Sequence, residues 1–129
     1  MPGGGAFEVA AYQHLLDFAR ENVSGKTKIG VTAFAEALLV VPRTLAENSG
    51  LDVQDSLLKV IEKHQSTKGA YGLDVNTGDA QAVIEASIFD NYIVKRQFLN
   101  LAPVLAQQLL LVDEVMRAGR QMGRSAEEE

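Results

Sequence analysis

The sequence has no cysteine and only two histidines, His14 and His64. The lack of cysteine excludes disulfide bonds, thiol catalysis and cysteine-ligated metal sites. No P-loop, zinc cluster, nucleophile elbow or dinucleotide fingerprint occurs either. The glycine-rich residues 3–5 are not followed by the lysine and hydroxyl residue that a P-loop requires. The common catalytic and cofactor motifs therefore leave the function open.

Clusters of basic side chains are also missing. The chain carries 12 basic and 17 acidic residues, a formal net charge of -5. Without basic runs or stripes, nucleic acid and anionic membrane surfaces are not expected partners. Apolar runs such as Leu109–Val112 are too short to cross a bilayer. With 129 residues, of which 47% are hydrophobic, the sequence has the size and composition of one globular domain or part of a larger one.

What the sequence does contain is apolar residues at helical spacing. The predicted helices cover residues 7–18, about 29–48, 53–65 and 91 to about 116. Pro42 should kink or break the second helix, and Pro103 should do the same to the last. Gly50 stands where the second helix should stop, and Asp52 where the third should be capped. The sequence thus predicts a mainly α-helical fold.

The spacing also predicts which side of each helix faces a core. The inner faces are predicted as Phe7, Ala11, His14, Leu15 and Phe18 in the first helix, and Ala33, Phe34, Ala37, Leu38 and Val41 in the second. His14 is expected to be a packed core residue, and His64 a surface or rim residue near a helix C-terminus. The last helix is apolar on most of its circumference, which predicts a central place in a core.

Residues 69–96 are the part of the chain that does not have a helical pattern throughout. Tyr71, Leu73 and Val75 alternate within 70–75, a turn follows at residues 76–79, and a second short strand is plausible near Ala82–Ile84. Asparagine and glycine in the turn tolerate the positive φ that tight hairpins need. A small β-hairpin is therefore predicted within residues 70–84.

Asp90 stands where this hairpin passes into the last helix. It can cap that helix, the commoner role for a single aspartate at such a position. It can also contribute to a site for a polar ligand, because backbone donors, a turn and a carboxylate meet there. Gly3–Gly5, ahead of the first helix, allow close approach of a ligand to the backbone, although such a glycine run is more often a flexible lead-in. The pattern alone leaves both alternatives open.

Several segments resemble the equatorial domains of group II chaperonins. Residues 41–52, VPRTLAENSGLD, are similar to the family signature I-P-R-T-L-A-E-N-A-G-L-D. Residues 2–6, PGGGA, resemble the glycine-rich segment where family chains re-enter that domain. The segments 72–78, GLDVNTG, and 110–119, LLVDEVMRAG, are similar to the family's hairpin and last helix. These matches run in family order over nearly the whole chain.

The resemblance implies a domain assignment. Residues 1–119 would form the C-terminal half of an equatorial domain, and the polar residues 120–129 a disordered tail. Residues 87–97, SIFDNYIVKRQ, are similar to the zeta branch of the eukaryotic cytosolic chaperonin, where most of the family has Asp-Pro in place of Asp-Asn. The family usually has glycine where this chain has Ser87, and has no proline at the position of Pro103. These departures bear on local backbone geometry.

The resemblance also implies a nucleotide site. By residue-to-residue correspondence, Gly4 and Gly5 would offer backbone to the ribose and adenine, and Asp90 would accept hydrogen bonds from ribose hydroxyls. Lys95 would lie near the same site, and Leu73 and Asp74 would line the adenine side. The family's Gly-Asp-Gly-Thr-Thr loop for phosphate and Mg²⁺ and its catalytic aspartate have no counterpart in this sequence. The chain would bind ATP or ADP without holding the metal, and would not hydrolyse ATP alone, since phosphoryl transfer needs a metal clamp and a positioned water.

At the level of the whole protein, the resemblance implies part of an ATP-dependent cytosolic chaperonin subunit. Its partners would be other subunits in a hetero-oligomeric double ring and unfolded client proteins, and its location the cytoplasm. The alternative is a helical protein-interaction module that kept the fold and lost catalysis. Because the last helix is so apolar, we also expect the isolated chain to associate with itself.

Overall fold

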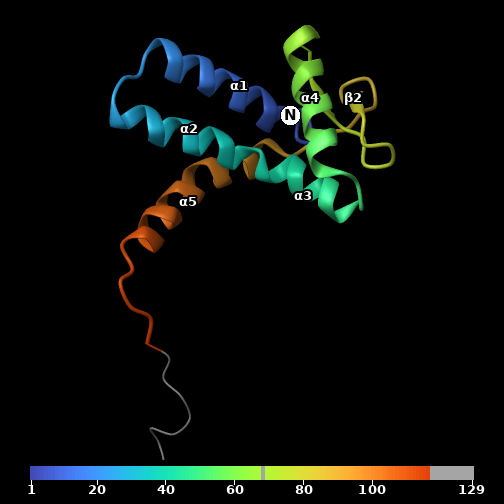
Figure 1. The fold of residues 1–129 in the computed structure, drawn as a ribbon. Coiled ribbons are helices and arrows are strands. Elements are labelled where there is room, and N and C mark those ends of the chain that lie inside the picture. Colours follow the sequence, from blue (N-terminus) through green and yellow to red (C-terminus); the bar gives the residue numbers. More distant parts are fainter. Residues whose placement is uncertain (68, 117–129) are drawn as a thin grey trace, which may run out of the picture. The chain divides into compact units, whose positions relative to one another are not determined.

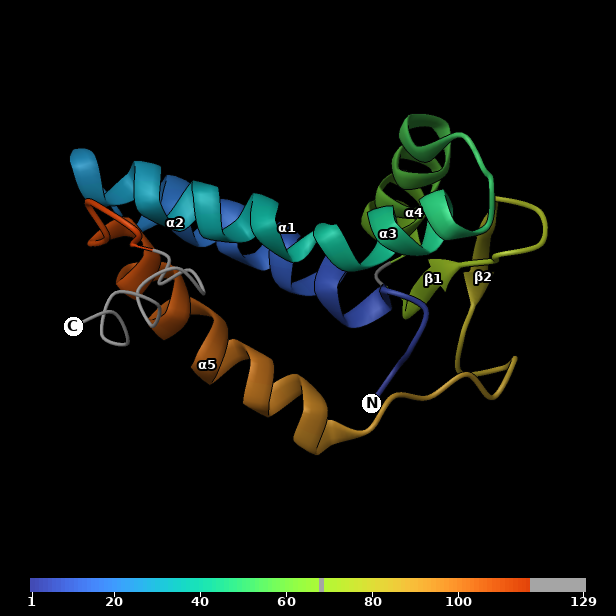
Figure 2. The same cartoon turned by 90° about the horizontal axis from the view of Figure 1, so that it is seen from below.

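The computed structural model describes residues 1–67 and 69–116 and divides the chain into two compact units, Met1–Tyr92 and Ile93–Glu129. Within the described residues, helices dominate and one two-stranded sheet is present (Figures 1 and 2). The predicted fold class, mainly helical with a small hairpin, is therefore confirmed. The segment predicted as a polar tail, residues 120–129, lies outside the described residues.

Four helices form most of the first unit. They are α1 (Ala6–Glu21), α2 (Lys26–Leu38), α3 (Val40–Asn48) and α4 (Val53–Thr67). Helices α1 and α2 run side by side after a short connection (Figures 1 and 2). The predicted interruption near Pro42 is confirmed, because α2 ends at Leu38 and α3 begins at Val40 with the proline in its first turn. Helix α2 begins three residues before the predicted Ile29.

The predicted helix boundaries around residue 50 are also confirmed. Helix α3 ends at Asn48, and the N–H groups of Gly50 and Leu51 donate to the carbonyls of Glu47 and Ala46. The Oδ1 of Asp52 accepts from the backbone N–H of Asp55 at 2.9 Å, which is the N-cap bond expected for α4. Local capping chemistry therefore fixes where α3 stops and α4 starts.

The hairpin pairs β1 (Tyr71–Leu73) with β2 (Ala80–Ala82) in antiparallel register, Gly72 opposite Gln81. The predicted second strand, Ala82–Ile84, was wrong by two residues. The chain turns back earlier because Asp74 exchanges backbone bonds with Asp79 and Gly78. These bonds close the loop at residue 79, so pairing starts at once at Ala80.

The core of the first unit is formed by residues of α1, α3, α4 and β1 and by the residue between α2 and α3. Its buried cluster consists of Val9, Leu39, Ala46, Val60 and Leu73. Leu57 and Val60 of α4 are buried. The hairpin thus lies against the helices through Leu73, which is 3% exposed.

The predicted inner faces of α1 and α2 were partly wrong. His14 is exposed rather than packed, and Phe18 is 44% exposed, whereas Val9 and Ala19 are buried. In α2 and the residue after it, Ala35, Leu38 and Leu39 are buried, whereas Ala33 and Ala37 are exposed. Apolar residues occur on more than one side of both helices, so neighbouring elements decided which side is covered.

Helix α5 (Tyr92–Leu110) lies in the second unit from its second residue on. It starts one residue after the predicted residue 91 and ends six residues before Met116. The N–H groups of Leu111 and Val112 donate three residues back, which tightens the last turn, and Asp113 and Glu114 are unfavourable at a helix C-terminus. Pro103 lies inside the helix without splitting it.

The predicted central position of this helix in a core was wrong. Lys95 is its only buried residue, and Leu105 and Leu109 are 62% and 74% exposed. Most of its apolar side chains are therefore exposed.

One stretch of the first unit is long and apolar enough to cross a membrane by length and composition alone, namely Lys26–Asn48. It contains α2, α3 and the break between them. Core helices of soluble proteins pass the same test, and Leu38, Leu39, Pro42 and Ala46 of this stretch are buried in the fold. The stretch is weak support for a membrane segment.

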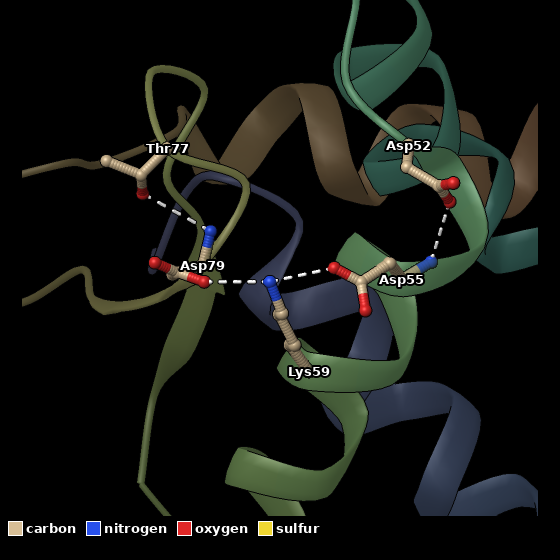
Figure 3. Close-up of polar contacts among 5 residues, drawn as sticks. All are labelled: Asp52, Asp55, Lys59, Thr77 and Asp79. Atoms are coloured by element: carbon tan, nitrogen blue, oxygen red, sulfur yellow. Dashed lines mark hydrogen bonds and ion pairs between the residues drawn. The ribbon is translucent and has the colours of Figure 1, made fainter.

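An ionic link ties the hairpin to α4 (Figure 3). The Nζ of Lys59 lies 2.7 Å from Asp55 Oδ2 and 3.0 Å from Asp79 Oδ1. Hydrogen bonds to Asp55 and Asp79 raise the pKa of Lys59 above its ordinary value. The Asp79 N–H also donates to the hydroxyl of Thr77. These contacts hold the turn of the hairpin against the helix and so help to position the end of β1.

Candidate functional site

The first unit contains a partly open cavity of about 580 Å³. Its volume lies within the range of about 300–1,000 Å³ that small-molecule sites usually have. The lining residues are Gly4, Gly5, Val41, Leu45, Leu73, Asp74, Val75, Asn76, Gln81, Ala86, Ile88 and Asp90. They come from the glycine segment, α3, the hairpin and the residues before α5.

The glycine segment forms one wall through bonds to the strand-like residues 88–90. The Gly3 N–H donates to the Ile88 carbonyl at 3.0 Å, and the Asp90 N–H donates to the Met1 carbonyl at 2.9 Å. Pro2 and Phe89 form an isolated antiparallel bridge between these bonds. This pairing places the Asp90 carboxylate against the glycine backbone: a Cβ atom at Gly3 would lie 3.1 Å from Asp90 Oδ1.

Gly4 and Gly5 turn the chain from that wall into α1. Both have left-handed backbone, with φ +59 and +79, a conformation that residues with side chains rarely adopt. The Gly4 carbonyl accepts from the Leu73 N–H at 2.8 Å, which joins the segment to β1. Gly5 precedes the first residue of α1, so the positive end of the helix dipole lies at this edge of the cavity.

The opposite wall is the end of β1. Leu73 belongs both to the core and to the cavity lining. The Asp74 Oδ1 accepts from the N–H and the side-chain amide of Asn76 at 2.9 and 3.2 Å. The backbone bond from Asn76 lowers the pKa of Asp74 below its ordinary value. The Asp74 carboxylate therefore stabilises the turn, and the residue forms part of the cavity wall.

The cavity brings together five of the six residues expected at the site. Gly4, Gly5, Leu73, Asp74 and Asp90 all line it, although they are up to 86 positions apart in the sequence. Lys95 is not among the lining residues and belongs to the second unit. There it is 5% exposed, with its Nζ 5.8 Å from the centre of the Phe98 ring. The gathering of the five residues is a geometric finding, and their roles in binding stay a prediction.

Other lining residues were not predicted from the sequence. Val41, Leu45 and Ile88 give the cavity apolar surface, and Asn76 and Gln81 add two amides. Val41 and Leu45 belong to the segment 41–52 that was singled out for its motif, which is the signal that could have identified them. Gln81 carried no signal, because its position depends on the register of the hairpin.

The composition of the lining limits what the cavity can hold. Two aspartates, an asparagine and a glutamine line it beside apolar residues, and none of the described residues that line it is lysine or arginine. Such a surface suits a neutral group with an apolar ring and hydroxyls, because a carboxylate accepts hydrogen bonds from hydroxyls and repels phosphate. Over residues 1–67 and 69–116, no group of three or more histidine, aspartate or glutamate side chains is arranged to hold a metal ion.

Ser87 adjoins the cavity and has an unusual backbone conformation. It has φ +57 and is the one residue other than glycine with positive φ in the described part of the chain. Its neighbours Ala86 and Ile88 line the cavity. The group II chaperonins, which this sequence resembles, usually have glycine here, and the positive φ gives the physical reason for that preference.

We therefore expect Ser87→Gly to stabilise the chain by up to about 1 kcal/mol. Left-handed backbone costs a residue with a side chain about 1–2 kcal/mol, and the greater freedom of glycine in the unfolded chain removes part of this gain. Urea unfolding followed by circular dichroism measures the change. The matched control is Ser49→Gly, at a position with φ -90; an equal response of the two variants would contradict the prediction.

Both the sequence and the fold have relatives among known proteins. A sequence model described as the TCP-1/cpn60 chaperonin family matches residues 1–120. T-complex protein 1 subunit zeta-2 of Mus musculus is 47% identical over 119 residues, which is 92% of this chain and 22% of that protein. The same subunit of Homo sapiens is 44% identical over an equal span. This chain therefore spans about a fifth of the length of these relatives.

A solved structure shares the fold. An open-state monomer of a group II chaperonin from Methanococcoides burtonii matches with a TM-score of 0.80 and 32% sequence identity. The match covers 87% of this chain and 28% of that one. The similarity in sequence and the similarity in structure point to the same group of proteins.

Proposed function

Because this chain belongs to the TCP-1/cpn60 chaperonin family, we propose that it supplies the ribose and adenine side of a nucleotide site in a chaperonin subunit. Residues 1–119 would be the C-terminal half of the equatorial domain. The observation that carries the proposal is the single cavity in which Gly4, Gly5, Leu73, Asp74 and Asp90 meet.

The cavity suits a nucleoside better than a phosphate. Its apolar side chains can contact a base, and Asp90 can accept hydrogen bonds from ribose hydroxyls. The bound nucleotide would supply the phosphoryl group, whereas the residues of this chain would bind and orient the nucleoside. Mg²⁺ and the phosphates would be held by parts of the subunit outside this sequence, because the lining has no basic side chain.

We also propose that this chain is part of a subunit of an ATP-dependent cytosolic chaperonin, which assists protein folding. The similarity to the zeta-2 subunits of Mus musculus and Homo sapiens, 47% and 44% identical over 119 residues, supports this proposal. The partners would be other subunits of a ring and unfolded client proteins. A helical interaction module without nucleotide binding is the alternative, and the following experiment separates the two.

We expect Asp90→Asn to weaken adenosine binding to this chain by about 5- to 150-fold. That range corresponds to about 1–3 kcal/mol for a hydrogen bond to a charged acceptor. Isothermal titration calorimetry with adenosine and with 2′-deoxyadenosine measures it. If Asp90 contacts the ribose, the preference for adenosine over the deoxy compound should shrink in the variant.

Two comparisons make the result specific. Asp17→Asn makes the same charge change on the exposed side of α1, outside the cavity, and should leave affinity unchanged. ADP should bind about as tightly as adenosine, because the cavity lacks basic side chains for the phosphates. A folded chain with no affinity for adenosine at millimolar concentration would favour the interaction module, and equal affinity of the parent and Asp90→Asn would remove Asp90 from the site.

A further inference from the structure

Gln81 lines the candidate cavity, but the contacts proposed above for the ribose do not use it. It is the middle residue of β2 and lies opposite Gly72 of β1. The pairing continues to Val83, whose N–H donates to the carbonyl of Ala70. Directly opposed residues and residues two apart along a strand have their side chains on one face of a sheet. Gly72, Gln81 and Val83 therefore share one face of the hairpin.

That face of the hairpin is turned toward the glycine segment. A Cβ atom at Gly72 would lie 2.6 Å from the Gly4 carbonyl oxygen and 2.9 Å from the Gly3 carbonyl oxygen. It would also lie 2.7 Å from Val83 Cγ1, which agrees with the shared face. The register of the hairpin thus explains how Gln81 comes to line a cavity whose other wall is formed by the glycine segment.

The two amide side chains of the lining differ in what they already bind. The Asn76 Nδ2 donates to Asp74 Oδ1 at 3.2 Å, so this amide stabilises the turn. Over residues 1–67 and 69–116, the side-chain amide of Gln81 makes no hydrogen bond. Gln81 is partly buried. Its carbonyl oxygen and its NH2 group can therefore both bind a group that enters the cavity.

We propose, on the basis of the nucleoside site proposed above, that Gln81 determines its specificity for adenine. The amide oxygen accepts a hydrogen bond from the 6-amino group, and the amide NH2 donates to N7. Glutamine matches this edge of adenine with two hydrogen bonds. Guanine and hypoxanthine have an oxygen at position 6 and so present two acceptors, of which one amide can satisfy only one.

This role of Gln81 divides the nucleoside between two parts of the cavity. Asp90, in the segment before α5, accepts from the ribose hydroxyls, whereas Gln81, in the hairpin, reads the edge of the base. The apolar residues Val41, Leu45 and Ile88 also line the cavity and can contact the faces of a purine ring. Each segment therefore supplies the kind of group that its part of the nucleoside requires.

Isothermal titration calorimetry of the whole chain with four nucleosides tests the role of Gln81. Purine riboside lacks the 6-amino group, 7-deazaadenosine has C–H in place of N7, and inosine has an oxygen at position 6. Each should bind about 2- to 12-fold more weakly than adenosine, the value of one lost hydrogen bond. Equal affinity for all four nucleosides would overturn the proposal, and this result requires no variant.

Two substitutions assign the preference to residue 81. Gln81→Met keeps the length of the side chain without its polar atoms, so adenosine should bind about 5- to 150-fold more weakly and the four affinities should become similar. Gln81→Glu keeps an acceptor for the 6-amino group and loses the donor to N7. It should therefore still prefer adenosine to purine riboside, but should no longer prefer adenosine to 7-deazaadenosine.

Gln54→Met is the matched control, because Gln54 is exposed in the first turn of α4 and is not a lining residue. It should keep the affinities of the parent chain, and circular dichroism checks that all three variants are folded. A folded parent chain without affinity for adenosine would overturn both the proposed function and the role of Gln81. Adenosine binding that weakens in Asp90→Asn, together with unchanged preferences in Gln81→Met, would overturn the role of Gln81 alone.

Discussion

Gly5→Ala should lower the free energy of unfolding of the first unit by about 2–5 kcal/mol. Gly5 has φ +79, and left-handed backbone costs a residue with a Cβ about 1–2 kcal/mol. The added Cβ would also lie 2.7 Å from the Cβ of Pro42 and 3.3 Å from its Cα. Pro42 is buried in α3 and its ring cannot move aside freely. Overpacking of this kind costs about 1–3 kcal/mol more.

Gly25→Ala is the matched control for this experiment. Gly25 has φ +66, and a Cβ there would meet nothing within 4 Å. The Gly25→Ala variant should therefore lose only the free energy of the backbone strain, about 1–2 kcal/mol. Urea unfolding at one low protein concentration gives both values and keeps self-association out of the comparison. Equal losses in the two variants would show that the contact with Pro42 does not limit residue 5.

Gly72→Ala is expected to cost about 3 kcal/mol and to disrupt the wall of the cavity. An added Cβ would lie 2.6 Å from the Gly4 carbonyl oxygen, 2.7 Å from Val83 Cγ1 and 2.9 Å from the Gly3 carbonyl oxygen. Real Cβ atoms essentially never come this close, so either β1 or the glycine segment must shift. Val83 is fully buried and has no room to yield. The cost should therefore reach the upper part of the range of about 1–3 kcal/mol for overpacking.

Gly30→Ala is the control for this second experiment. Gly30 lies inside α2, and a Cβ there would meet nothing within 4 Å. Alanine is favoured over glycine in a helix by about 0.5–1 kcal/mol, so this variant should gain stability. The same urea titrations measure both. A Gly72→Ala variant as stable as the parent would mean that the glycine segment does not pack against β1 at this distance.

These two expected effects describe how the cavity is built. Gly5 allows the glycine segment to approach α3, and Gly72 allows it to approach β1. The bond from the Leu73 N–H to the Gly4 carbonyl completes the contact. Three segments that are far apart in the chain are thus held together by close backbone packing. The Asp90 carboxylate depends on the same packing, because it lies against Gly3.

Local features of the sequence predicted most helix boundaries well. The interruption before Pro42, the stop at Gly50 and the cap at Asp52 were all confirmed. Each of these boundaries depends on one residue and its near neighbours, because the hydrogen bonds that end or cap a helix span only a few positions in the sequence. The strand β2 was misplaced by two residues because its start depended on how the loop after Asp74 closes. That closure uses hydrogen bonds that periodicity does not reveal.

The cavity shows a different limit on what the sequence alone can predict. The site residues were named through segments that resemble a family, and five of them line one cavity. Their spacing in the sequence contains no information about their distance in space. Gln81 was missed because only the register opposite Gly72 turns it toward the cavity wall.

By itself, the sequence determined the helical class, the hairpin, the caps and the apolar character of α5, because each follows from local backbone preference and short-range hydrogen bonds. Only the tertiary structure decided which sides of α1 and α2 are buried, since both helices carry apolar residues on several sides. His14 is exposed and Val9 buried for that reason. The tertiary structure also decided that Gly3–Gly5, β1 and Asp90 meet, because this meeting depends on contacts between backbones separated by about 70 to 90 residues, which no local rule encodes.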